Sequence, residues 1–490
     1  MRHSPVPLGW GPLGVATVAA VVHLAVATRY GWHRDEFYYV ICGRHPAWGY
    51  VDQPPLTPLV GALAAALPGG LWPLRLVAIA AQVACILLTA LLAAQFGGRP
   101  RAQAIAAAAV AGTPIFVGAS ALYGTAVTDQ VFWLLILVLV ARALRLGETS
   151  AWAPAGLAAG VGLLNKSTVV ILLAGILLGL IMFRRDALRG PGPWLAGGIA
   201  VLVAVPNLVW NARHGWPDLE MARVLSRAQG GALGSVQQLP ILLVVLAGPL
   251  LVALWVIGIR FLVSPAGRRH RWVLVVTAVA VLLVTLSGGK PYYAAPMLAA
   301  LYAAGGVRIE QVGLARGRVR RVGWVVLTAA SFVLAVLVWL PVLPVRAANA
   351  MRDISPVLVE TYGWPQFVDQ VAAAAAPLPP AVPIFTGNYG EAGALSILGP
   401  AAGVDRAVYS GHNNYALWGP PPGRPDTVLC VGRFKPGYLE RFWAEVRKIA
   451  DIRPPDGVDN AEKSGGAAIY LCGQPRGDWA QLWPGLRHFD

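Results

Sequence analysis

Long apolar stretches, separated by short polar segments, run along the first 345 residues of the chain. Most of them have about 20 residues, the length that a helix needs to cross the apolar core of a bilayer. We predict eleven membrane helices from this pattern, with residues 151–183 open to interpretation as one hairpin or as a distorted pair. The stretches cover residues 8–28, 71–96, 103–121, 129–146, 151–165, 167–183, 192–211, 239–263, 272–287, 292–307 and 322–345.

The pattern changes beyond Arg346, where Pro, Gly, Asn and Asp become frequent. Three strand-like runs follow, AVPIFTG, TVLCVG and AAIYLCG, together with one helical stretch, LERFWAEVRKIADI. Short apolar runs bounded by turn residues are typical of strands. We therefore expect an α-helical polytopic membrane domain over residues 1–345 and a small α/β domain over residues 346–490.

The composition excludes a water-soluble protein. The chain is 57% hydrophobic and only 13% charged, whereas soluble domains have about 25% charged residues. Its formal net charge is +16, but the basic residues lie mainly in short loops beside apolar segments, where they set membrane orientation. We therefore expect contact with anionic lipid and not with nucleic acid. The apolar stretch after Arg2 is longer than that of a signal peptide, and it is predicted to be the first membrane helix.

The arginines also predict the topology, because positive residues collect on the cytoplasmic side of a membrane. Placing the N-terminus in the cytoplasm puts most of the loop arginines there as well. The same arrangement places residues 29–71, 211–239 and 288–293 and the C-terminal domain outside the plasma membrane. The second half of the first outer segment, LTPLVGALAAALPGG, is too short to cross, so we expect a helix on or dipping into the membrane surface.

Three carboxylates lie in the first outer segment. The stretch HRDEFYYVICGRHPAWGYVDQPPLTPL, residues 33–59, carries Asp35, Glu36 and Asp52. Acids at a membrane face are costly unless they are solvated, bound to metal or functional. One of them can take a proton from an attacking hydroxyl, and another can hold the acceptor or a cation. Alternatively, Asp35 and Glu36 only occupy the first turn of a surface helix, where carboxylates interact favourably with the helix dipole.

The D-E pair soon after the first helix, followed by an acid just before P-P-L, resembles the GT-C superfamily. It looks like glycosyltransferase family 39 and its relatives, which include protein O-mannosyltransferases and lipid A aminoarabinose transferases. The resemblance implies a sugar donor linked to polyprenyl phosphate and a catalytic aspartate in the first outer loop, here Asp35. Aminoarabinose transferases have a lysine where this chain has Gln53, so Lys290, Lys166 or Arg44 would have to replace that phosphate contact.

Asp129 and His214 lie in two further motifs that resemble the family, YGTAVTDQ at 123–130 and PNLVWNARHGWPDLE at 206–220. The resemblance makes Asp129 part of an acidic cluster with Asp52, on the acceptor side. It makes His214 a ligand of the donor phosphate or of a metal, because imidazole suits both. The alternatives are a helix N-cap for Asp129 and a structural role for His214.

Lys290, Tyr292 and Tyr293 belong to a fourth motif, GGKPYYAAPMLAAL at 288–301. A lysine can neutralise phosphate as a point charge, and a tyrosine hydroxyl can donate a hydrogen bond to it. The same residue types also anchor helix ends at membrane interfaces without any ligand. Lys166, in LLNKST, either meets the donor phosphate or marks a turn.

The resemblance implies an inverting transfer, in which an acceptor hydroxyl deprotonated by Asp35 attacks the sugar of a polyprenyl-phosphate donor. The acceptor is expected to be a lipid, a glycan or a protein. Glu36, the second catalytic candidate, would orient the acceptor, or would bind a divalent cation such as Mg or Mn together with Asp35 and Asp129. Nothing in the sequence requires that cation. The alternative function is a transporter or lipid flippase, which predicts ionisable residues near the membrane midplane.

The C-terminal domain adds two open questions. Cys430 and Cys472 lie in strand-like runs and can form a disulfide outside the cell or remain as two buried thiols. The stretches GNYGEAGAL at 387–395 and SGHNNYALWGP at 410–420 combine polar and aromatic residues that suit carbohydrate. The same residue types also make turns, so a loop without a ligand is the competing interpretation.

Overall fold

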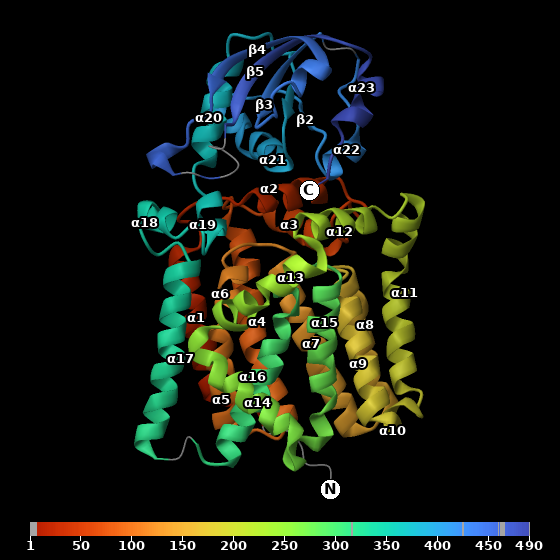
Figure 1. The fold of residues 1–490 in the computed structure, drawn as a ribbon, viewed down its shortest axis with the longest axis vertical. Coiled ribbons are helices and arrows are strands. Elements are labelled where there is room, and N and C mark those ends of the chain that lie inside the picture. Colours follow the sequence, from red (N-terminus) through yellow and green to blue (C-terminus); the bar gives the residue numbers. More distant parts are fainter. Residues whose placement is uncertain (1–6, 315–316, 424–425, 459, 461–465, 490) are drawn as a thin grey trace.

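The computed structural model describes residues 7–314, 317–423, 426–458, 460 and 466–489. It has a bundle of helices with a smaller domain, built on a sheet, at one end (Figure 1). Each apolar stretch of the sequence contains at least one helix of this bundle. The bundle helices are α1 Trp10–Val26, α4 Trp72–Gln95, α5 Pro100–Ala111, α6 Pro114–Ser120, α7 Thr125–Leu146, α8 Ala153–Leu163, α9 Val169–Phe183, α10 Arg185–Leu188, α11 Gly192–Arg213, α14 Val252–Val263, α15 Trp272–Leu286, α16 Pro296–Gln311 and α17 Arg318–Trp339.

Within the described residues, four helices are long and apolar enough to cross a membrane, namely α4, α7, α11 and α17. The pair α5 and α6 passes the same test together, but the chain bends by 63° between them. Pro114 begins α6 there, and a proline cannot continue the hydrogen-bond ladder of the preceding helix. Several other apolar helices are shorter. The fold is thus that of a polytopic α-helical membrane protein, while the number of eleven membrane helices stays a prediction.

Small residues let the helices at the centre of the bundle approach one another closely. A Cβ at Gly258 of α14 would lie 2.1 Å from the carbonyl oxygen of Leu301 on α16. In the opposite direction, a Cβ at Gly305 would lie 2.3 Å from the carbonyl oxygen of Leu254. Close approach through small residues is a common way for helices to associate in a membrane. The two helices therefore form a tightly packed pair, and α16 is buried along most of its length.

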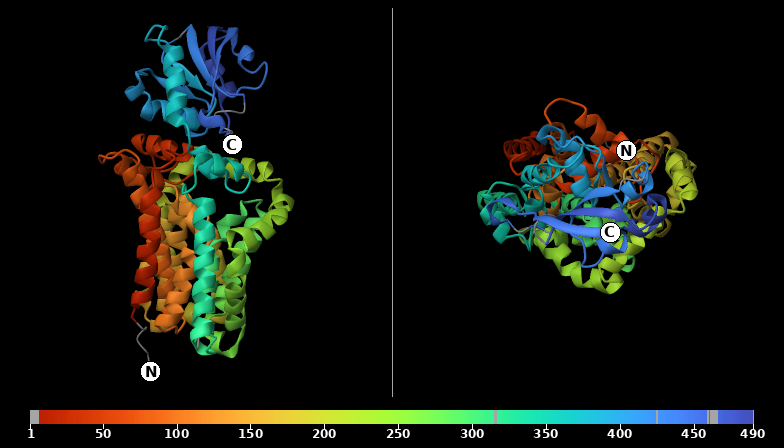
Figure 2. Two further views of the ribbon diagram at one scale, coloured as in Figure 1. Left: turned by 90° about the vertical axis from the view of Figure 1, so that its left-hand side faces the viewer. Right: turned by 90° about the horizontal axis from the view of Figure 1, so that it is seen from above.

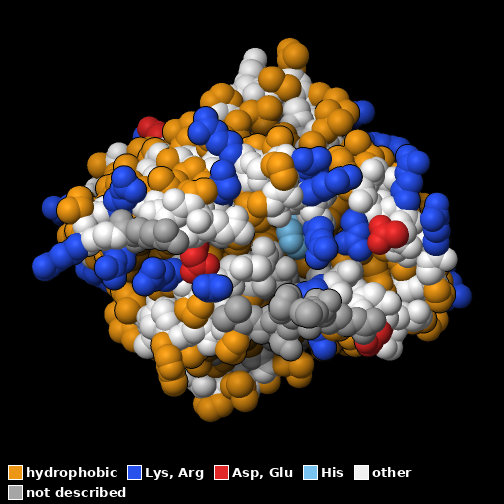
Figure 3. All heavy atoms as spheres, turned by 90° about the horizontal axis from the view of Figure 1, so that it is seen from below, with side chains coloured by type: hydrophobic (Ala, Val, Ile, Leu, Met, Phe, Trp, Pro, Cys, Tyr) orange, Lys and Arg blue, Asp and Glu red, His pale blue; other side chains and the backbone are white. Residues whose placement is uncertain are grey.

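Basic side chains gather at the end of the bundle that lies away from the sheet domain (Figure 3). This is the end of the connections from α9 through α10 to α11 and from α16 to α17 (Figure 1). Acidic side chains are few on the same face (Figure 3). The distribution is the one that the positive-inside rule predicts for a cytoplasmic face. The orientation of the termini remains a prediction.

Short helices lie between the bundle and the sheet domain (Figures 1 and 2). The second half of the first outer segment forms α3, whose ten residues are too few to cross a bilayer. The helices of this layer are α2 Arg34–Arg44, α3 Leu56–Ala65, α12 Pro217–Ala228, α18 Val345–Ala350 and α19 Pro356–Glu360, with α13 Gly231–Pro240 leading back into the bundle.

The smaller domain contains a five-stranded sheet with the order β2-β1-β3-β5-β4. β1 runs parallel to β2 and β3, whereas β5 runs antiparallel to β3 and β4. Neighbouring residues point to opposite faces, so Leu429 packs with Trp364 of α20 while Val428 packs with Trp443 and Trp483. The elements are α20 Trp364–Ala375, β1 Ile384–Thr386, α21 Tyr389–Leu398, β2 Val408–Ser410, α22 Asn414–Trp418, β3 Thr427–Gly432, β4 Trp443–Asp451, β5 Ala468–Pro475 and α23 Trp479–Leu486.

The predicted strands AVPIFTG, TVLCVG and AAIYLCG correspond to β1, β3 and β5, but the helix predicted over LERFWAEVRKIADI is wrong. Residues Leu439–Arg441 form a single 3-10 turn, and Trp443–Asp451 form strand β4. Glu, Arg, Lys and Ala favour helices, yet β4 gains an antiparallel ladder with β5, which one irregularity between Lys448 and Ala450 interrupts. Tertiary pairing of this kind overrides local propensity. As the edge strand, β4 carries charged residues, which discourage pairing with another chain.

Cys430 and Cys472 are free, buried thiols in the same cluster of apolar side chains. Cys430 pairs in register with Tyr470, and Cys472 pairs with Val428. The two residues are therefore diagonal neighbours on adjacent strands. Of the two alternatives that the sequence left open, the structure has the pair of buried thiols.

Candidate active site

The site begins at the N-terminus of α2, where a capping box fixes the first turn. His33 is the N-cap, and its Nδ1 accepts a hydrogen bond from the backbone N–H of Asp35 at 3.2 Å. In return, the carboxylate of Glu36 accepts from the backbone N–H of His33 at 2.9 Å. Such reciprocal bonds satisfy donors that a helix start leaves without partners. The first turn of α2 thereby presents Asp35 in a defined position.

Glu36 is fully buried, and both oxygens of its carboxylate accept hydrogen bonds. Arg75 of α4 donates from Nη2 to Oε2 at 2.9 Å, and the backbone N–H of Tyr123 donates to Oε1, also at 2.9 Å. Arg75 also donates to the backbone carbonyl of Gly31 at 2.8 Å. Through these contacts, the buried carboxylate of Glu36 connects α2 to the helix bundle. Because it has no exposed surface, Glu36 does not reach an acceptor in this conformation, in contrast to the role expected from the sequence.

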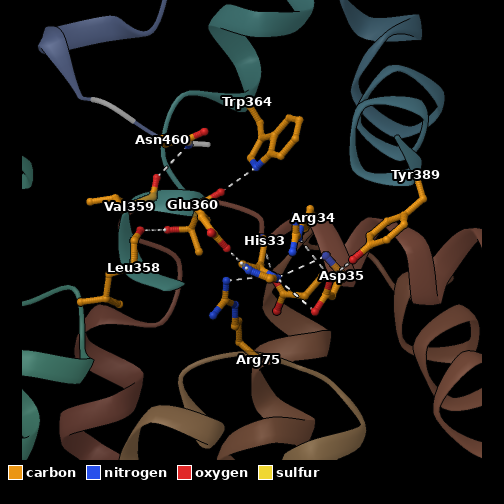
Figure 4. Close-up of polar contacts among 12 residues, drawn as sticks. His33, Arg34, Asp35, Arg75, Leu358, Val359, Glu360, Trp364, Tyr389 and Asn460 are labelled. Atoms are coloured by element: carbon orange, nitrogen blue, oxygen red, sulfur yellow. Dashed lines mark hydrogen bonds and ion pairs between the residues drawn. The ribbon is translucent and has the colours of Figure 1, made fainter. Parts of the chain in front are cut away.

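Asp35 differs from its neighbour, because its side chain is 38% exposed. The hydroxyl of Tyr389, at the start of α21, donates to Oδ1 at 2.8 Å (Figure 4). Arg34 Nε lies 3.7 Å from Oδ1, and His33 Nδ1 lies 3.7 Å from Oδ2. Burial acts to raise the pKa of Asp35, but His33, Arg34, the Tyr389 hydroxyl and Lys290 together outweigh it. The pKa is therefore lowered, and Asp35 is an ionised carboxylate at neutral pH.

Asp52 lies in a different electrostatic environment. The hydroxyl of Tyr38 donates to its Oδ1 at 3.0 Å, and Asn413 Nδ2 donates to its Oδ2 at 3.5 Å. Burial raises the pKa of Asp52 to about 7, helped by the negative charges of Asp35 and Asp218 and opposed by the Tyr38 hydrogen bond. Two carboxylates in one site thus differ in protonation, which is typical of acid and base groups with separate tasks.

The C-terminal domain supplies contacts to both aspartates. Tyr389 binds Asp35, while Asn413 binds Asp52. Next to it, Asn414 accepts from the backbone N–H of Val51 at 3.2 Å and donates its own backbone N–H to the Tyr38 hydroxyl at 3.2 Å. These residues come from the two stretches that seemed suited to carbohydrate. In this structure they hold the outer loop of the membrane domain.

A cavity of about 260 Å³ lies beside Asp52. It is lined by the start of α9, by α12 and by the segment before α16. Lys166 and Lys290 both line it, and the ammonium of Lys166 lies 4.2 Å from the ring centroid of Tyr293 and 5.7 Å from that of Tyr292. Three of the predicted phosphate ligands, Lys166, Lys290 and Tyr293, therefore meet at one cavity, whose other polar lining includes Asp52, Gln53, Thr168, Asp218, Ser226 and Gln229.

The remaining predicted residues lie outside the lining of this cavity. Asp129 is buried and accepts a hydrogen bond from the hydroxyl of Thr168 at 2.8 Å, so it supports the lining from behind. His214 is exposed at the end of α11, where it stacks on Trp210 at 4.1 Å between ring centroids and bonds the Trp210 carbonyl at 2.8 Å. Tyr292 lies against Tyr293 with centroids 4.8 Å apart. The structure therefore does not bring His214 to Lys290.

The residues present do not fit the divalent cation that the acidic cluster had suggested. Among the described residues, no three His, Cys, Asp or Glu side chains are grouped so that they could hold a metal ion. The three proposed ligands also have different hydrogen-bond partners. Asp35 accepts from Tyr389, Glu36 from Arg75 and Asp129 from Thr168.

Several residues of the site escaped the sequence analysis. Asp218 lines the cavity, accepts from Asn211 at 3.2 Å, and has a pKa raised to about 6 by burial. The sequence pointed to Asp218 only through its position in WPDLE, the last part of the motif at residues 206–220. Arg75 had a clearer signal, because a single arginine within an otherwise apolar membrane stretch requires a partner. Tyr389 lies in GNYGEAGAL, which the sequence analysis had singled out for carbohydrate, but its contact with Asp35 was not foreseen.

Known proteins share part of this sequence and its fold. Residues 52–210, about a third of the chain, match the family model described as dolichyl-phosphate-mannose-protein mannosyltransferase. No curated protein sequence matches the chain. Among solved structures, ArnT from Cupriavidus metallidurans bound to undecaprenyl phosphate has a TM-score of 0.59 at 15% identity, covering 94% of this chain and 97% of that one.

A second structural relative is the arabinofuranosyltransferase AftD from Mycobacteria, with a TM-score of 0.52 at 12% identity. The similarity covers 96% of this chain but only 42% of AftD. At such low identity, the two likenesses establish the shared fold. Together with the family match over residues 52–210, they make the chain similar in sequence and fold to membrane glycosyltransferases of the GT-C superfamily.

Proposed function

We propose that the protein transfers a sugar from a polyprenyl-phosphate donor to an acceptor hydroxyl at the outer face of the membrane, with inversion at the anomeric carbon. Support for the donor comes from ArnT, which was crystallised with undecaprenyl phosphate, and from the family model, which describes enzymes that use dolichyl-phosphate mannose. The acceptor would be a lipid, a glycan or a protein.

The observation that carries this proposal is the state of Asp35. It is an ionised, half-exposed carboxylate at a fixed helix start. It is close enough to Lys290 for the lysine to lower its pKa, and Lys290 lines the cavity. A general base must be ionised at the working pH and must be accessible to the acceptor. Asp35 meets both requirements, whereas Glu36 is buried and Asp52 is partly protonated at neutral pH.

In the proposed reaction, the carboxylate of Asp35 accepts the proton of the acceptor hydroxyl. The acceptor oxygen forms a bond to the anomeric carbon as the bond from that carbon to the phosphate oxygen breaks. Polyprenyl phosphate leaves with the electron pair, and Asp35 afterwards releases its proton to water. Because the leaving group is already an anion, it requires electrostatic stabilisation and no strong acid.

Lys166 and Lys290 would provide that stabilisation from the cavity wall. Two ammonium groups facing one small cavity suit a phosphate, which a lysine binds as a point charge. The ammonium of Lys166 lies over the ring of Tyr293, an aromatic contact that does not neutralise its charge.

Transfer by the purified protein in lipid nanodiscs tests the proposal, with a set of polyprenyl-phosphate sugars as donors. Asp35→Asn keeps a hydrogen-bond acceptor for Tyr389 but removes the base, and we expect transfer to fall by about 10²-fold or more. Asp353→Asn, at a fully exposed aspartate, is the matched control and should keep full activity. Equal turnover in Asp35→Asn would remove Asp35 from the mechanism. Absence of transfer and of donor hydrolysis with every donor would overturn the proposed activity.

A further inference from the structure

A second, larger cavity of about 660 Å³ lies in the C-terminal domain, and it is strongly basic. Its described lining contains neither Asp nor Glu. Four of its five cations, Arg433, Lys435, Arg441 and Arg487, are exposed, and the fifth, Arg34, is partly exposed. We refer to this cavity as the basic cleft.

Few acids neutralise these cations. Arg487 is 3.5 Å from Glu220 of α12, but both side chains are substantially exposed, and exposed ion pairs of this kind contribute little. Arg441 and Arg487 lie over aromatic rings, at 5.6 Å from Phe442 and 4.5 Å from Phe489. Contacts with aromatic rings do not neutralise the positive charges of these two arginines. Clustered like charges repel one another and concentrate anions in a cleft.

Arg433 and Lys435 come soon after the end of strand β3, and both line the cleft. Among the described residues, neither of them forms an ion pair with an acid. Two partly buried aromatic residues of the cleft, Phe434 and Tyr438, stack with centroids 6.0 Å apart and an interplanar angle of 8°. Aromatic side chains beside cations are a combination that suits a sugar carrying an anionic group.

The basic cleft adjoins the candidate base. Arg34 lines the cleft, and its Nε is 3.7 Å from Oδ1 of Asp35. Arg34 also lies over the ring of Tyr389, at 5.7 Å from the centroid, while Tyr389 bonds Asp35. His412, another lining residue, accepts from the backbone N–H of Tyr389 at 3.3 Å. Arg34 is therefore shared between the cleft and the candidate base, and Tyr389 contacts both Asp35 and the lining residue His412.

We propose that the basic cleft binds an anionic group of the sugar acceptor, a phosphate or a carboxylate, and thereby selects acidic glycans or glycolipids as acceptors. The inference rests on the proposed transfer activity and extends it to the class of acceptor. An anion held by Arg433 and Lys435 places the neighbouring part of the acceptor toward Arg34. Because Arg34 Nε is 3.7 Å from Oδ1 of Asp35, a hydroxyl of the acceptor near Arg34 is within reach of the candidate base.

Binding of glucose 6-phosphate to the protein in nanodiscs of zwitterionic lipid tests this inference, with glucose and inorganic phosphate as comparison probes. We expect glucose 6-phosphate and inorganic phosphate to bind and glucose to give no signal. Arg433→Gln combined with Lys435→Gln should weaken binding of the phosphates by about tenfold or more, because charge-assisted hydrogen bonds are lost. Arg447→Gln combined with Arg453→Gln removes the same charge from exposed positions outside the cleft and should leave binding within about twofold.

Equal binding by the cleft double variant, or equal binding of glucose, would overturn the inference. Competition by anionic phosphatidylglycerol in the nanodisc, strong enough to abolish glucose 6-phosphate binding, would assign the cleft to bulk lipid headgroups and would overturn it as well. Donor hydrolysis by water separates this inference from the proposed activity, since the cleft variant should keep it. Phosphate binding without any turnover in the wild type would instead contradict the transferase proposal alone.

Discussion

The hydroxyl of Tyr389 donates a 2.8 Å hydrogen bond to the carboxylate of Asp35, although 354 residues separate the two in the chain. Asp35 belongs to the outer segment after the first helix, and Tyr389 belongs to the C-terminal domain. The helices that carry them are in close contact, since a Cβ at Gly393 of α21 would lie 2.6 Å from Cβ of Phe37 on α2. The C-terminal domain is therefore part of the site and not an appendage to it.

Tyr389→Phe should raise the pKa of Asp35, because the hydrogen bond from Tyr389 is one of the interactions that lower it. The acidic limb of the pH profile of kcat/KM should move upward by up to about one unit. Tyr409→Phe is a suitable control, because Tyr409 lies in the same domain on β2 and its hydroxyl forms no hydrogen bond with the described residues. An unchanged profile in Tyr389→Phe would mean that Asp35 does not set the acidic limb.

Asp52 should make donor binding depend on pH near neutrality. Its pKa of about 7 means that it gains a negative charge as the pH rises through that value. The charge develops at the wall of the cavity that holds Lys166 and Lys290, so it opposes binding of an anionic phosphate. We expect the KM for the donor to increase between pH 6 and pH 8, about the range over which such a group titrates. Asp52→Asn should flatten this dependence, and a rise that persists in the variant would exclude Asp52 as its cause.

Lys290→Gln should weaken donor binding, because it removes one of the two ammonium groups at the cavity. A lost charge-assisted contact to phosphate corresponds to an increase in KM of about tenfold or more. Lys448→Gln changes an exposed lysine on the edge strand β4 and serves as the control. If the KM for the donor is the same in both variants, the phosphate does not lie at this cavity.

Glu36→Gln should destabilise the fold, because it leaves the buried guanidinium of Arg75 without its counter-charge. Breaking a buried ion pair by removing one partner typically lowers the free energy of unfolding by about 3–5 kcal/mol. The exposed pair of Arg184 and Asp186 offers a comparison, since Asp186→Asn should lower it by less than about 1 kcal/mol. Thermal unfolding midpoints in detergent measure both effects. Normal stability of Glu36→Gln with lost transfer would instead support a direct role of Glu36 in catalysis.

The membrane part of the fold could be predicted because its signal is local. An apolar run long enough to cross a membrane can be recognised in the sequence whatever the helix later packs against. The motifs around Asp35 and Lys290 are likewise continuous in sequence. The structure brings the two residues close enough to interact electrostatically. The proline bend between α5 and α6 was also encoded locally, by Pro114.

The features that could not be predicted depend on contacts between segments that are distant in the sequence. Strand β4 has a helical composition and becomes a strand only because β5 is available as a partner. Asp35 and Glu36 are adjacent residues of similar chemistry. Glu36 forms a buried ion pair with Arg75, whereas the side chain of Asp35 stays partly exposed, and the sequence does not show this difference. His214 belongs to a motif of the family, yet stacking on Trp210 at the end of α11 keeps it outside the cavity.

The bond between Asp35 and Tyr389 has a consequence for the order in which the enzyme matures. During synthesis, the outer segment with Asp35 emerges first, and residue 389 follows only after the bundle helices have been made. Until α21 has folded against α2, Asp35 lacks its hydrogen-bond partner. The candidate site is therefore complete only after the C-terminal domain has been made and has packed against α2.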